Sequence, residues 1–544
     1  MPLPQPAVAA CAVFLALFCA PAVAVEIAPT VPSAAELEES HARIGAILIN
    51  VGDIFDTTKP GENKRLYRFA NRVHIDTHES VLRAQLLFAE GDLFSERVLE
   101  ESERTLRRLR YIREPKVRAV AFHDGVVDVE VTAADVWTMS PGLSFGRKGG
   151  ANSTSVEFDD YNVLGMGKRL SIGSSSNEER SSTTFEWKDP NVLGSRWTSA
   201  VGYADSDDGN SSAFSIERPF YSFDTRWTAG LSVGQDDGVL HRYALGERVD
   251  EYRRDSRTAD LHFGTSRGWD NGWVRRFTAG LRLDEARFGN DAAYLPSANL
   301  PDNRRLTYPY AAMEWIQDDF VTGTNLDQIE RTEDFEFGKR YMVELGQSAG
   351  IFGADRSDTL LRASASRGWR IHPRHALFFG ANLASRIGAG NDNSLFSASA
   401  RYYWNTSDNT LFYTSLQGDL GHALDADTDL SLGGDNGLRG YPLRYQTGRA
   451  RGLLTLEERF FTKWYPWRLF NVGAAVFADI GRTFGAGAIE TPQLGMLRDV
   501  GFGLRLSNSR SALANVLHID VAFPLDGDSS LKSVQFLIET KRSF

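Results

Sequence analysis

The chain has 544 residues, and its 60 lysines and arginines against 71 aspartates and glutamates give a formal net charge of −11. This acidic balance argues against a nucleic-acid-binding protein, which needs a basic surface, and hydrophobic residues at 42% exclude a disordered chain. The only cysteines, Cys11 and Cys19, stand near the start. The rest of the chain therefore cannot form a disulfide framework, a zinc–cysteine site or a cysteine nucleophile.

The first residues resemble a targeting segment. Residues 7–24 carry no charge and end in Ala22-Val23-Ala24, the small-residue pattern of a signal-peptide cleavage site. The opening MPLPQP lacks the usual basic residues, so a single membrane anchor is the alternative. We expect residues 1–24 to be a signal peptide and residues 25–40 to be an N-terminal lead.

Residues 41–135 predict a small α/β unit of order β-α-α-β-β. After the strand RIGAILINVGDIF, one helix is expected from about Glu79 to Phe88 with Thr77 as N-cap. A second helix follows Ser95, its expected N-cap. The strands KVRAVAF and VVDVEVTA complete a three-stranded sheet under one helical layer.

The second helix combines an apolar stripe with a charged face. The stripe consists of Val98, Leu99, Leu106 and Leu109, which recur at helical spacing and predict a buried side. The pairs Glu100–Arg104 and Glu103–Arg107 lie four residues apart on the opposite face. That charge run favours a solvated surface over a binding site.

Residues 136–544 show strand-like alternation without helical periodicity. In FTAGLRLD and LHIDVAF, apolar side chains alternate with polar or small ones, as expected for strands with one apolar face. About twenty such segments follow one another, and their polar faces carry Arg, Asp, Glu, Ser and Gly. A closed barrel in a membrane, with a wet lumen, accounts for this pattern. Tandem β-sandwiches or a propeller are the runner-up, but no clear repeat runs through the region.

One short repeat predicts a pair of matching turns. Asn162-Val-Leu-Gly165 recurs as Asn191-Val-Leu-Gly194, 29 residues further on. Asn and Gly are turn residues, and this spacing fits one out-and-back hairpin between the turns. Both turns are therefore expected on the same side of the membrane.

A glycine-rich loop and a later strand carry the most specific pattern. The loop, residues 430–448, contains Leu438-Arg439-Gly440-Tyr441, and the strand contains Phe477-Ala-Asp479-Ile-Gly481. An arginine inside a barrel needs a carboxylate partner, and Asp479 lies on the strand face opposite Ala478 and Ile480. On the strand that directly follows the loop, Glu457 and Arg459 share one face.

These motifs resemble the BamA/TamA-like outer-membrane assembly superfamily. The tetrad is similar to its V/I-R-G-F/Y motif, and the strand is similar to its F-x-D-x-G motif. The α/β unit resembles a POTRA domain, and Phe544, after the alternating Phe536, Ile538 and Thr540, resembles the C-terminal signal of outer-membrane barrels. The resemblance covers nearly the whole mature chain. It implies that the loop folds back into the lumen, where Asp479 engages Arg439.

The predicted fold class is mainly β: a transmembrane antiparallel barrel preceded by one POTRA-like α/β unit. The resemblance implies about 16 strands, whereas the sequence offers about fifteen segments before the loop and five after it, which gives about twenty. Only one POTRA-like unit is present, and Arg542 stands where an apolar residue is usual.

Three other patterns carry no chemistry. Gly142-Leu-Ser144-Phe-Gly146 matches G-x-S-x-G but lies on an alternating strand rather than in a strand–turn–helix elbow. The triplet Asp425, Asp427 and Asp429 opens like a calcium loop but lacks the glycine and glutamate that should follow. The histidines show no metal-binding spacing. We therefore predict no catalytic residue, no metal site and no cofactor, and we expect the aspartates to lie in a solvated loop.

Two functions fit these expectations. The resemblance implies a bacterial outer-membrane protein whose α/β unit lies in the periplasm. In the first, it helps unfolded or β-rich client polypeptides to insert into the membrane or cross it, because a client strand pairs with an exposed sheet edge. In the second, it acts as a passive pore or lipid conduit on the same scaffold. Membrane lipids are expected partners in both cases, and the POTRA-like unit could receive a periplasmic partner in the first. No nucleotide-binding motif is present, so folding free energy must drive the first process.

Overall fold

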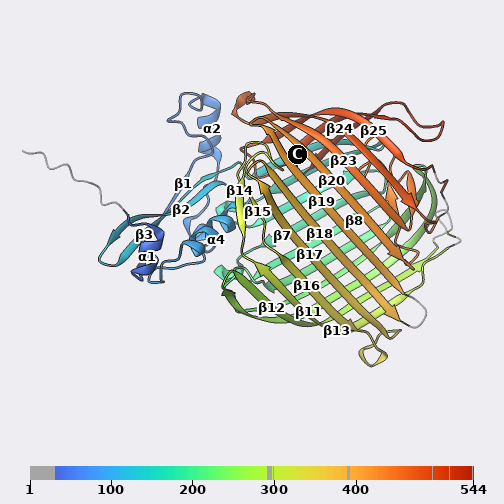
Figure 1. Ribbon diagram of the computed structural model, residues 1–544, viewed down its shortest axis with the longest axis horizontal. Helices are drawn as coiled ribbons and strands as arrows, with labels where there is room; N and C mark the ends of the chain where they lie inside the picture. The colour runs from blue at the N-terminus through green and yellow to red at the C-terminus, as the bar shows by residue number, and fades with distance from the viewer. Residues whose placement is uncertain are drawn as a thin grey trace, which may run out of the picture.

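The computed structural model describes residues 31–544 except 291–296, 298, 389–391, 490, 493, 514 and 542. The expected signal peptide and Arg542 lie outside the described residues. A small α/β unit is followed by a closed antiparallel barrel of twenty strands (Figure 1). Among the described residues, no helix has both the length and the apolar character needed to cross a membrane.

The α/β unit is a three-stranded sheet with helices packed on it. Its strand order is β1-β3-β2, with β1 parallel and β2 antiparallel to β3. In chain order, the elements are α1 (Ala34–Glu39), β1 (Arg43–Gly52), α2 (Arg65–Val73), α3 (Glu79–Arg83), α4 (Glu96–Arg107), β2 (Ile112–His123) and β3 (Val126–Asp135).

The core of this unit forms where the predicted stripe of α4 meets the sheet. Leu99 and Leu106 are buried against Val129 and its neighbours on β3, while Val98 and Leu109 are partly buried. Burying these alkyl side chains supplies most of the stabilisation, at about 1.5–3 kcal/mol for each fully buried one. The helix α1 also buries Leu37 in this core, so the unit begins before the expected residue 41.

Local details differ from the expected helices. The helix α3 ends at Arg83 rather than near Phe88, and His78 occupies its N-cap position. Thr77 is therefore not the cap; its hydroxyl donates to Asp135 Oδ1 at 2.6 Å, and its backbone N–H donates to Asp135 Oδ2 at 2.9 Å. Ser95 does precede α4, although its side chain makes no capping hydrogen bond.

The barrel strands run in chain order around the wall. Ten precede the hairpin β14–β15: β4 (Met139–Lys148), β5 (Ala151–Asp160), β6 (Arg169–Ser176), β7 (Ser181–Asp189), β8 (Thr198–Ser206), β9 (Gly209–Arg218), β10 (Trp227–Ala244), β11 (Glu247–Asp270), β12 (Trp273–Gly289) and β13 (Arg304–Gln317). Ten follow it: β16 (Arg340–Gln347), β17 (Asp358–His372), β18 (His375–Gly388), β19 (Asn393–Ser407), β20 (Thr410–His422), β23 (Ala450–Phe461), β24 (Phe470–Phe484), β25 (Leu497–Asn508), β26 (Val516–Pro524) and β27 (Gln535–Lys541).

Fifteen barrel strands precede the motif loop and five follow it. The segment count of about twenty is thereby confirmed, and the family's figure of about 16 does not apply to this chain. Two small sheets lie outside the wall: β14 (Phe320–Gly323) with β15 (Glu333–Glu336), and β21 (Leu430–Leu432) with β22 (Gln446–Gly448). The described part of the chain also has four short 3₁₀ segments in its connections: η1 (Val163–Gly165), η2 (Val192–Gly194), η3 (Gly350–Phe352) and η4 (Pro466–Arg468).

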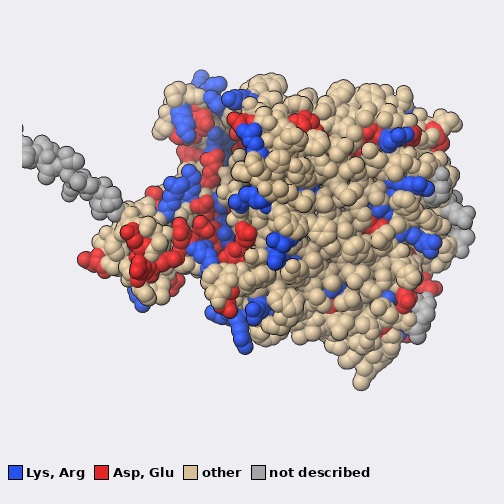
Figure 2. Space-filling view, viewed as in Figure 1, with Lys and Arg blue, Asp and Glu red and all other residues tan. Residues whose placement is uncertain are grey.

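Alternation separates an apolar exterior from a polar interior. On β26, Ile519 is exposed while His518 and Asp520 are buried. Exposed leucines, valines and phenylalanines recur outside the wall, with Leu143 at 84% exposure. Figure 2 shows charged residues gathered over the α/β unit and at the two rims, with a band of other residues between them. A continuous apolar belt with polar side chains inside is the surface of a membrane-spanning barrel.

The repeated turns lie at the end of the barrel that carries the α/β unit. Leu164 in η1 and Leu193 in η2 have nearly the same left-handed backbone, with φ of 51° and 52°. The first turn donates from Asn162 Nδ2 to Thr77 Oγ1 at 2.7 Å, and the second accepts from Gln85 at Asn191 Oδ1. Both turns contact the α/β unit and therefore lie at the same end of the barrel, as the repeat predicts.

The charged face of α4 is a contact surface, and the expectation of a solvated face is wrong. Arg107 pairs with Asp334 through two hydrogen bonds of 2.9 and 3.0 Å, while still pairing with Glu103. Arg104 is buried and lies 3.5 Å from Asp318. These aspartates belong to the connection between β13 and β16, so ion pairs hold α4 against the mouth of the barrel (Figure 1).

The barrel closes through a weak seam. The strands β27 and β4 share one registered residue pair, Ile538 with Arg147. The neighbouring ladders hold seven pairs between β26 and β27 and ten between β4 and β5. The first and last strands of the barrel thus meet with far fewer backbone contacts than either makes on its other side.

The buried leucine of α4 provides a test of the α/β core. We expect Leu106→Ala to lower the free energy of unfolding of this unit by about 2–5 kcal/mol, because it leaves a cavity beneath α4. Hydrogen exchange of the full-length protein should show lost protection in β1–β3 and unchanged protection in the barrel. Leu66→Ala, at a 68% exposed position on α2, is the control and should change little; equal losses in both variants would contradict this packing.

Candidate functional site in the barrel lumen

The motif loop folds back inside the barrel. It connects β20 to β23 at the end away from the α/β unit, and β21 and β22 pair at its base. Leu438, Tyr441 and Tyr445 of the loop are buried in one apolar cluster with Leu453 and Leu497 of the wall. The burial of these side chains fixes a glycine-rich segment that would otherwise be mobile.

Arg439 is the central contact of the loop. Its Nε donates to Asp479 Oδ2 at 2.7 Å and its Nη2 donates to Asp479 Oδ1 at 3.1 Å. Its Nη1 donates to Glu457 Oε2 at 2.9 Å. The guanidinium carbon also lies 3.3 Å from the centre of the Phe477 ring. A planar guanidinium can make a two-pronged bond, a third bond and a ring stack together, whereas lysine cannot.

The pair lies in an almost dry environment. The side chain of Arg439 is 7% exposed and that of Asp479 is 1% exposed. Charges removed from water in this way are tolerated only when they are paired and hydrogen-bonded. The contact therefore belongs to the buried class of ion pairs rather than to the water-screened class of a wet lumen.

Further charges of the wall surround this pair. Arg459 Nε donates to Glu457 Oε1 at 2.9 Å, so that Glu457 accepts from two arginines. Arg505 pairs with Asp520, which also lies 4.0 Å from Arg439 Nη1. These side chains project inward from β23 to β26, four strands in succession.

Glycines allow the loop and the wall to approach closely. The backbone N–H of Gly440 donates to Asp499 Oδ2 at 3.0 Å, and a Cβ on Gly440 would lie 2.6 Å from Asp499 Cβ. A Cβ on Gly501 would lie 2.4 Å from the Phe477 ring. A side chain at either position would separate groups that now touch.

Tyr441 and the loop base complete the attachment. The Tyr441 hydroxyl donates to the Arg498 carbonyl at 2.9 Å and accepts from the Arg498 N–H at 3.1 Å. Asp427 accepts two hydrogen bonds from Arg304, at 3.0 and 2.7 Å, and Asp425 accepts from Arg386 at 2.6 Å. Two members of the aspartate triplet, Asp425 and Asp427, are thus tied to the wall, and the expectation of a solvated loop is wrong for them.

A second segment folds inward at the opposite mouth. Ile329, between β14 and β15, is buried against Tyr403, Leu411 and the terminal Phe544. The Phe544 N–H donates to the Asp327 carbonyl at 2.6 Å, and Arg459 Nη1 donates to the Leu326 carbonyl at 2.5 Å. The C-terminal residue therefore points inward and packs against this hairpin.

The structure brings most of the predicted site residues together. Seven meet around the guanidinium or within its cluster: Leu438, Arg439, Gly440, Tyr441, Glu457, Phe477 and Asp479. Gly481 lies under the loop, where a Cβ would meet Leu432 at 3.0 Å, and Arg459 joins through Glu457. On the hairpin side, the ring centre of Phe544 lies 5.1 Å from the guanidinium carbon of Arg459.

Sequence reasoning missed Asp499, Gly501, Arg505 and Asp520. The alternation of β25 and β26 could have placed the three charged residues on the inner face. No sequence signal marks Gly501 as the residue beneath Phe477, because that contact depends on the register between β24 and β25. The role of Gly501 follows only from the assembled wall.

The remaining patterns behave as structural elements. Ser144 lies on β4 and its hydroxyl is 2.6 Å from the Ser155 hydroxyl of the next strand. Among the described residues, one group could present three metal-ligand atoms within 4.8 Å of one another: His74, Asp76 and Asp135. Both oxygens of Asp135 already accept hydrogen bonds from Thr77. The Thr77 hydroxyl in turn accepts from Asn162 of the barrel, so these residues join the α/β unit to the barrel.

The fold and the site define a transmembrane β-barrel with a motif loop clamped inside it by a buried Arg–Asp pair. No family model matches the sequence, and no curated protein matches it. Solved structures similar to this chain include CdiB from Acinetobacter baumannii, with 14% identity, a TM-score of 0.49 and coverage of 93% of this chain and 74% of that one. CdiB from Escherichia coli gives 14% identity, a TM-score of 0.49 and coverage of 92% and 76%.

BamA from Haemophilus ducreyi lacking POTRA domains 1–3 gives 13% identity, a TM-score of 0.38 and coverage of 92% and 85%.

The arginine clamp leads to a mutational prediction. We expect Arg439→Ala to lower the free energy of unfolding by about 3–5 kcal/mol, because it leaves buried carboxylates unpaired. Arg439→Lys should also lose stability, since an ammonium cannot replace the two-pronged bond. Asp479→Ala should add little once Arg439→Ala is present, and urea titrations of the four proteins of the cycle measure this coupling.

Arg498 provides the control for this cycle. It makes a two-pronged pair with Asp526 at 2.8 and 2.8 Å but is 54% exposed. Arg498→Ala should leave the urea midpoint almost unchanged, because water screens an exposed ion pair. Additive losses for Arg439→Ala and Asp479→Ala would contradict the pairing.

The inner hairpin should respond to pH. Burial raises the pKa of Glu333 to about 7, and nearby Asp327 acts in the same direction. The unfolded pKa is about 4.3, so the folded hairpin retains a proton that the unfolded chain releases. Hairpin stability should therefore be greatest below pH of about 4 and fall as pH rises towards 7.

Hydrogen exchange of residues 324–336, corrected for intrinsic rates, should show more protection at pH 5 than at pH 7. Glu333→Gln should remove most of this difference, and Glu336, whose pKa burial also raises, accounts for the rest. Glu330→Gln changes an exposed residue of the same hairpin and should leave the difference intact. Protection that rises with pH would show that the sign is wrong.

Proposed function

We propose that this chain is a bacterial outer-membrane protein of the BamA/TamA-like superfamily that helps polypeptides to insert into or cross that membrane. The observation that carries the proposal is the seam between β27 and β4, with its single registered pair. A barrel with one weak ladder can open there while its other ladders stay intact.

The energetics of the ladders favour opening at this place. Each backbone hydrogen bond contributes about 0.5–1.5 kcal/mol net, so separating β27 from β4 costs much less than separating β4 from β5. The freed edges would present unpaired N–H and C=O groups to a client strand. Hydrogen bonds to the client strand replace the hydrogen bonds that are lost when the seam opens, so folding free energy alone can drive insertion.

The occupied lumen favours this function over a passive pore. The motif loop enters from one end, and the hairpin β14–β15 enters from the other. Both are held by buried contacts: Arg439 with Asp479, and Ile329 with Phe544 and its neighbours. We place the α/β unit in the periplasm, where it meets clients before the barrel does, with membrane lipids around the apolar belt.

Disulfide locking tests the role of the seam. Residues 31–544 contain no cysteine, and paired residues on adjacent antiparallel strands lie within the Cα range of a disulfide. Arg147→Cys with Ile538→Cys would lock β4 to β27. Ile519→Cys with Ile538→Cys would lock β26 to β27 and is the matched control, since it shares one cysteine and reinforces a complete ladder.

Cells depleted of the wild-type protein and complemented with each variant provide the readout. We expect the seam-locked variant to lose the same outer-membrane or secreted proteins that depletion removes, while the control pair and the single-cysteine variants restore them. A seam-locked variant with full activity would refute the proposal. If depletion left the outer-membrane and secreted proteins unchanged but altered the lipids or the solute permeability, the passive conduit would be favoured.

A further inference from the structure

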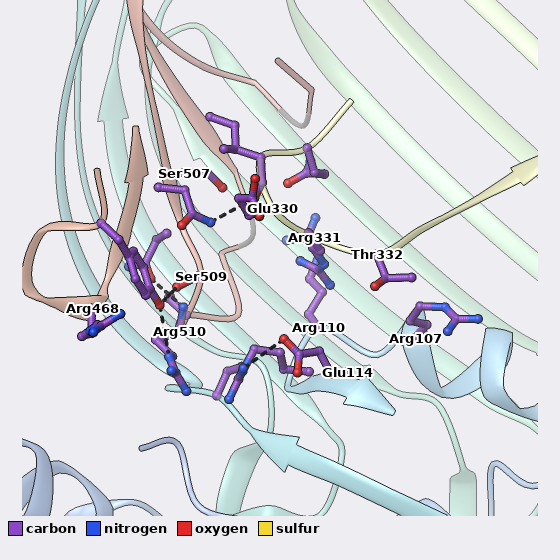
Figure 3. A pocket seen from close by; sticks show the side chains of 18 of the residues that line it. Arg107, Arg110, Glu114, Glu330, Arg331, Thr332, Arg468, Ser507, Ser509 and Arg510 are labelled. Carbon is purple, nitrogen blue, oxygen red and sulfur yellow. Dashed lines mark hydrogen bonds and ion pairs between the residues drawn. The ribbon is translucent and has the colours of Figure 1, made fainter. Parts of the chain in front are cut away.

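A cavity of about 550 Å³ lies where the α/β unit meets the mouth of the barrel. Its wall comes from the end of α4, the start of β2, the inner hairpin and the turns that follow β23 and β25 (Figure 3). This volume is in the range of binding pockets for ligands, about 300–1,000 Å³. Parts of the chain that are far apart in the sequence thus line one space at the entrance to the lumen.

The lining of this cavity is strongly basic. Six arginines and one lysine line it, against two glutamates. This contrasts with the net charge of −11 for the whole chain. Figure 3 shows Arg110, Arg331, Arg468 and Arg510 arranged around the same space. Low-dielectric walls of one charge sign concentrate the field inside a cleft and attract ligands of the opposite sign.

Three of the arginines are neutralised within the protein. Arg107 pairs with Asp334, Arg113 lies 3.2 Å from Glu114, and Arg510 Nη2 donates to Glu62 Oε1 at 2.7 Å. The Arg107–Asp334 pair joins the α/β unit to the hairpin, and the Arg510–Glu62 pair joins it to the barrel wall.

Four cations remain without a carboxylate. Among the described residues, none within 4.0 Å forms an ion pair with Arg110, Arg331, Lys463 or Arg468. Arg331 is partly buried, and its burial lowers its pKa below the ordinary value for a guanidinium. Glu333 attracts Arg331 without forming an ion pair, and Arg110 repels it. A desolvated charge without a close partner is costly, so an incoming anion would relieve that cost at this position.

We propose that this cavity binds an acidic segment of a client polypeptide, through carboxylates that pair with Arg110 and Arg331, before the segment reaches the barrel. The proposal rests on the proposed function and names the chemistry of the client. The lining also offers hydroxyl and amide side chains, from Thr332, Ser507 and Asn409, which can bind a peptide backbone. The cavity lies at the mouth of the lumen, on the inner side of the apolar belt, which favours a peptide over a lipid headgroup.

A peptide-binding measurement tests this site. The full-length protein is placed in nanodiscs of zwitterionic lipid and titrated against a fluorescent peptide rich in aspartate and glutamate. The comparison peptide has asparagine and glutamine at the same positions. We expect the amide peptide to bind at least about tenfold more weakly, and we expect binding to weaken when salt rises from about 0.01 M to about 1 M, which shortens the Debye length from about 30 Å to about 3 Å.

Two pairs of substitutions and one control locate the binding. Arg110→Gln with Arg331→Gln should weaken the acidic peptide at least about tenfold, equivalent to about 1.4 kcal/mol. Lys463→Gln with Arg468→Gln changes exposed side chains and should weaken it while leaving the buried contacts of the cavity wall in place. Arg374→Gln, at an exposed turn on the same side of the barrel, should leave binding unchanged.

The outcomes separate this proposal from the proposed function. The acidic-client site would be overturned if both peptides bound equally well, or if neither pair of substitutions changed binding. Either result would count against the site even if the seam-locking experiment succeeded. If the substitutions leave binding of the acidic peptide intact and anionic lipid in the nanodisc abolishes it, the cavity binds lipid. That result would also overturn the acidic-client site. Charge-selective binding that survives the seam lock would support the site even if insertion through the seam failed.

Discussion

The loop, the neighbouring strands and the terminal residues all depend on one constraint: buried carboxylates inside the wall need cations. Glu457, Asp479, Asp499 and Asp520 face inward from four successive strands, and Arg459 and Arg505 of the wall balance only part of this charge. Arg439 supplies a third cation from the loop. Without it, the strands would retain uncompensated charges at a cost of several kcal/mol. The wall therefore selects the inward position of the loop, and apolar burial of Tyr441 and Leu438 follows from that position.

The same constraint connects the two ends of the lumen. Glu457 accepts from Arg439 on the loop side and from Arg459 on the hairpin side, and Arg459 donates onward to the Leu326 carbonyl. A continuous series of polar contacts thus runs from one inward segment to the other through a single carboxylate. Withdrawal of either segment removes a partner from this series, so the remaining segment is held less firmly. Protonation of Glu333 acts on the hairpin at one end of it.

Much of this structure follows from local pattern, and the exceptions have a common physical cause. Period-2 alternation predicts fifteen strands before the loop and five after it, and the need to pair a buried arginine predicts the contact of Arg439 with Asp479. The charged face of α4 was misjudged because the partners of Arg104 and Arg107, Asp318 and Asp334, lie more than 200 residues away and no spacing indicates them. The helix α2 was missed because most of its apolar side chains remain exposed, so it lacks a stripe facing a core.

The seam can be explained by the strands that form it. The strand β4 contains Pro141 and two glycines, which weaken strand pairing, and β27 spans only Gln535–Lys541. The C-terminal end is instead held from inside, since Phe544 packs on Phe461 with ring centres 5.1 Å apart and His518 Nε2 lies 2.9 Å from the Ser543 carbonyl oxygen. Because these contacts fasten β27 to β26 and to the lumenal network, β4 can separate from β27 while the last strand keeps its place. The charge network that fixes the loop therefore also stabilises the β27 side of the seam at which we propose that a client strand pairs.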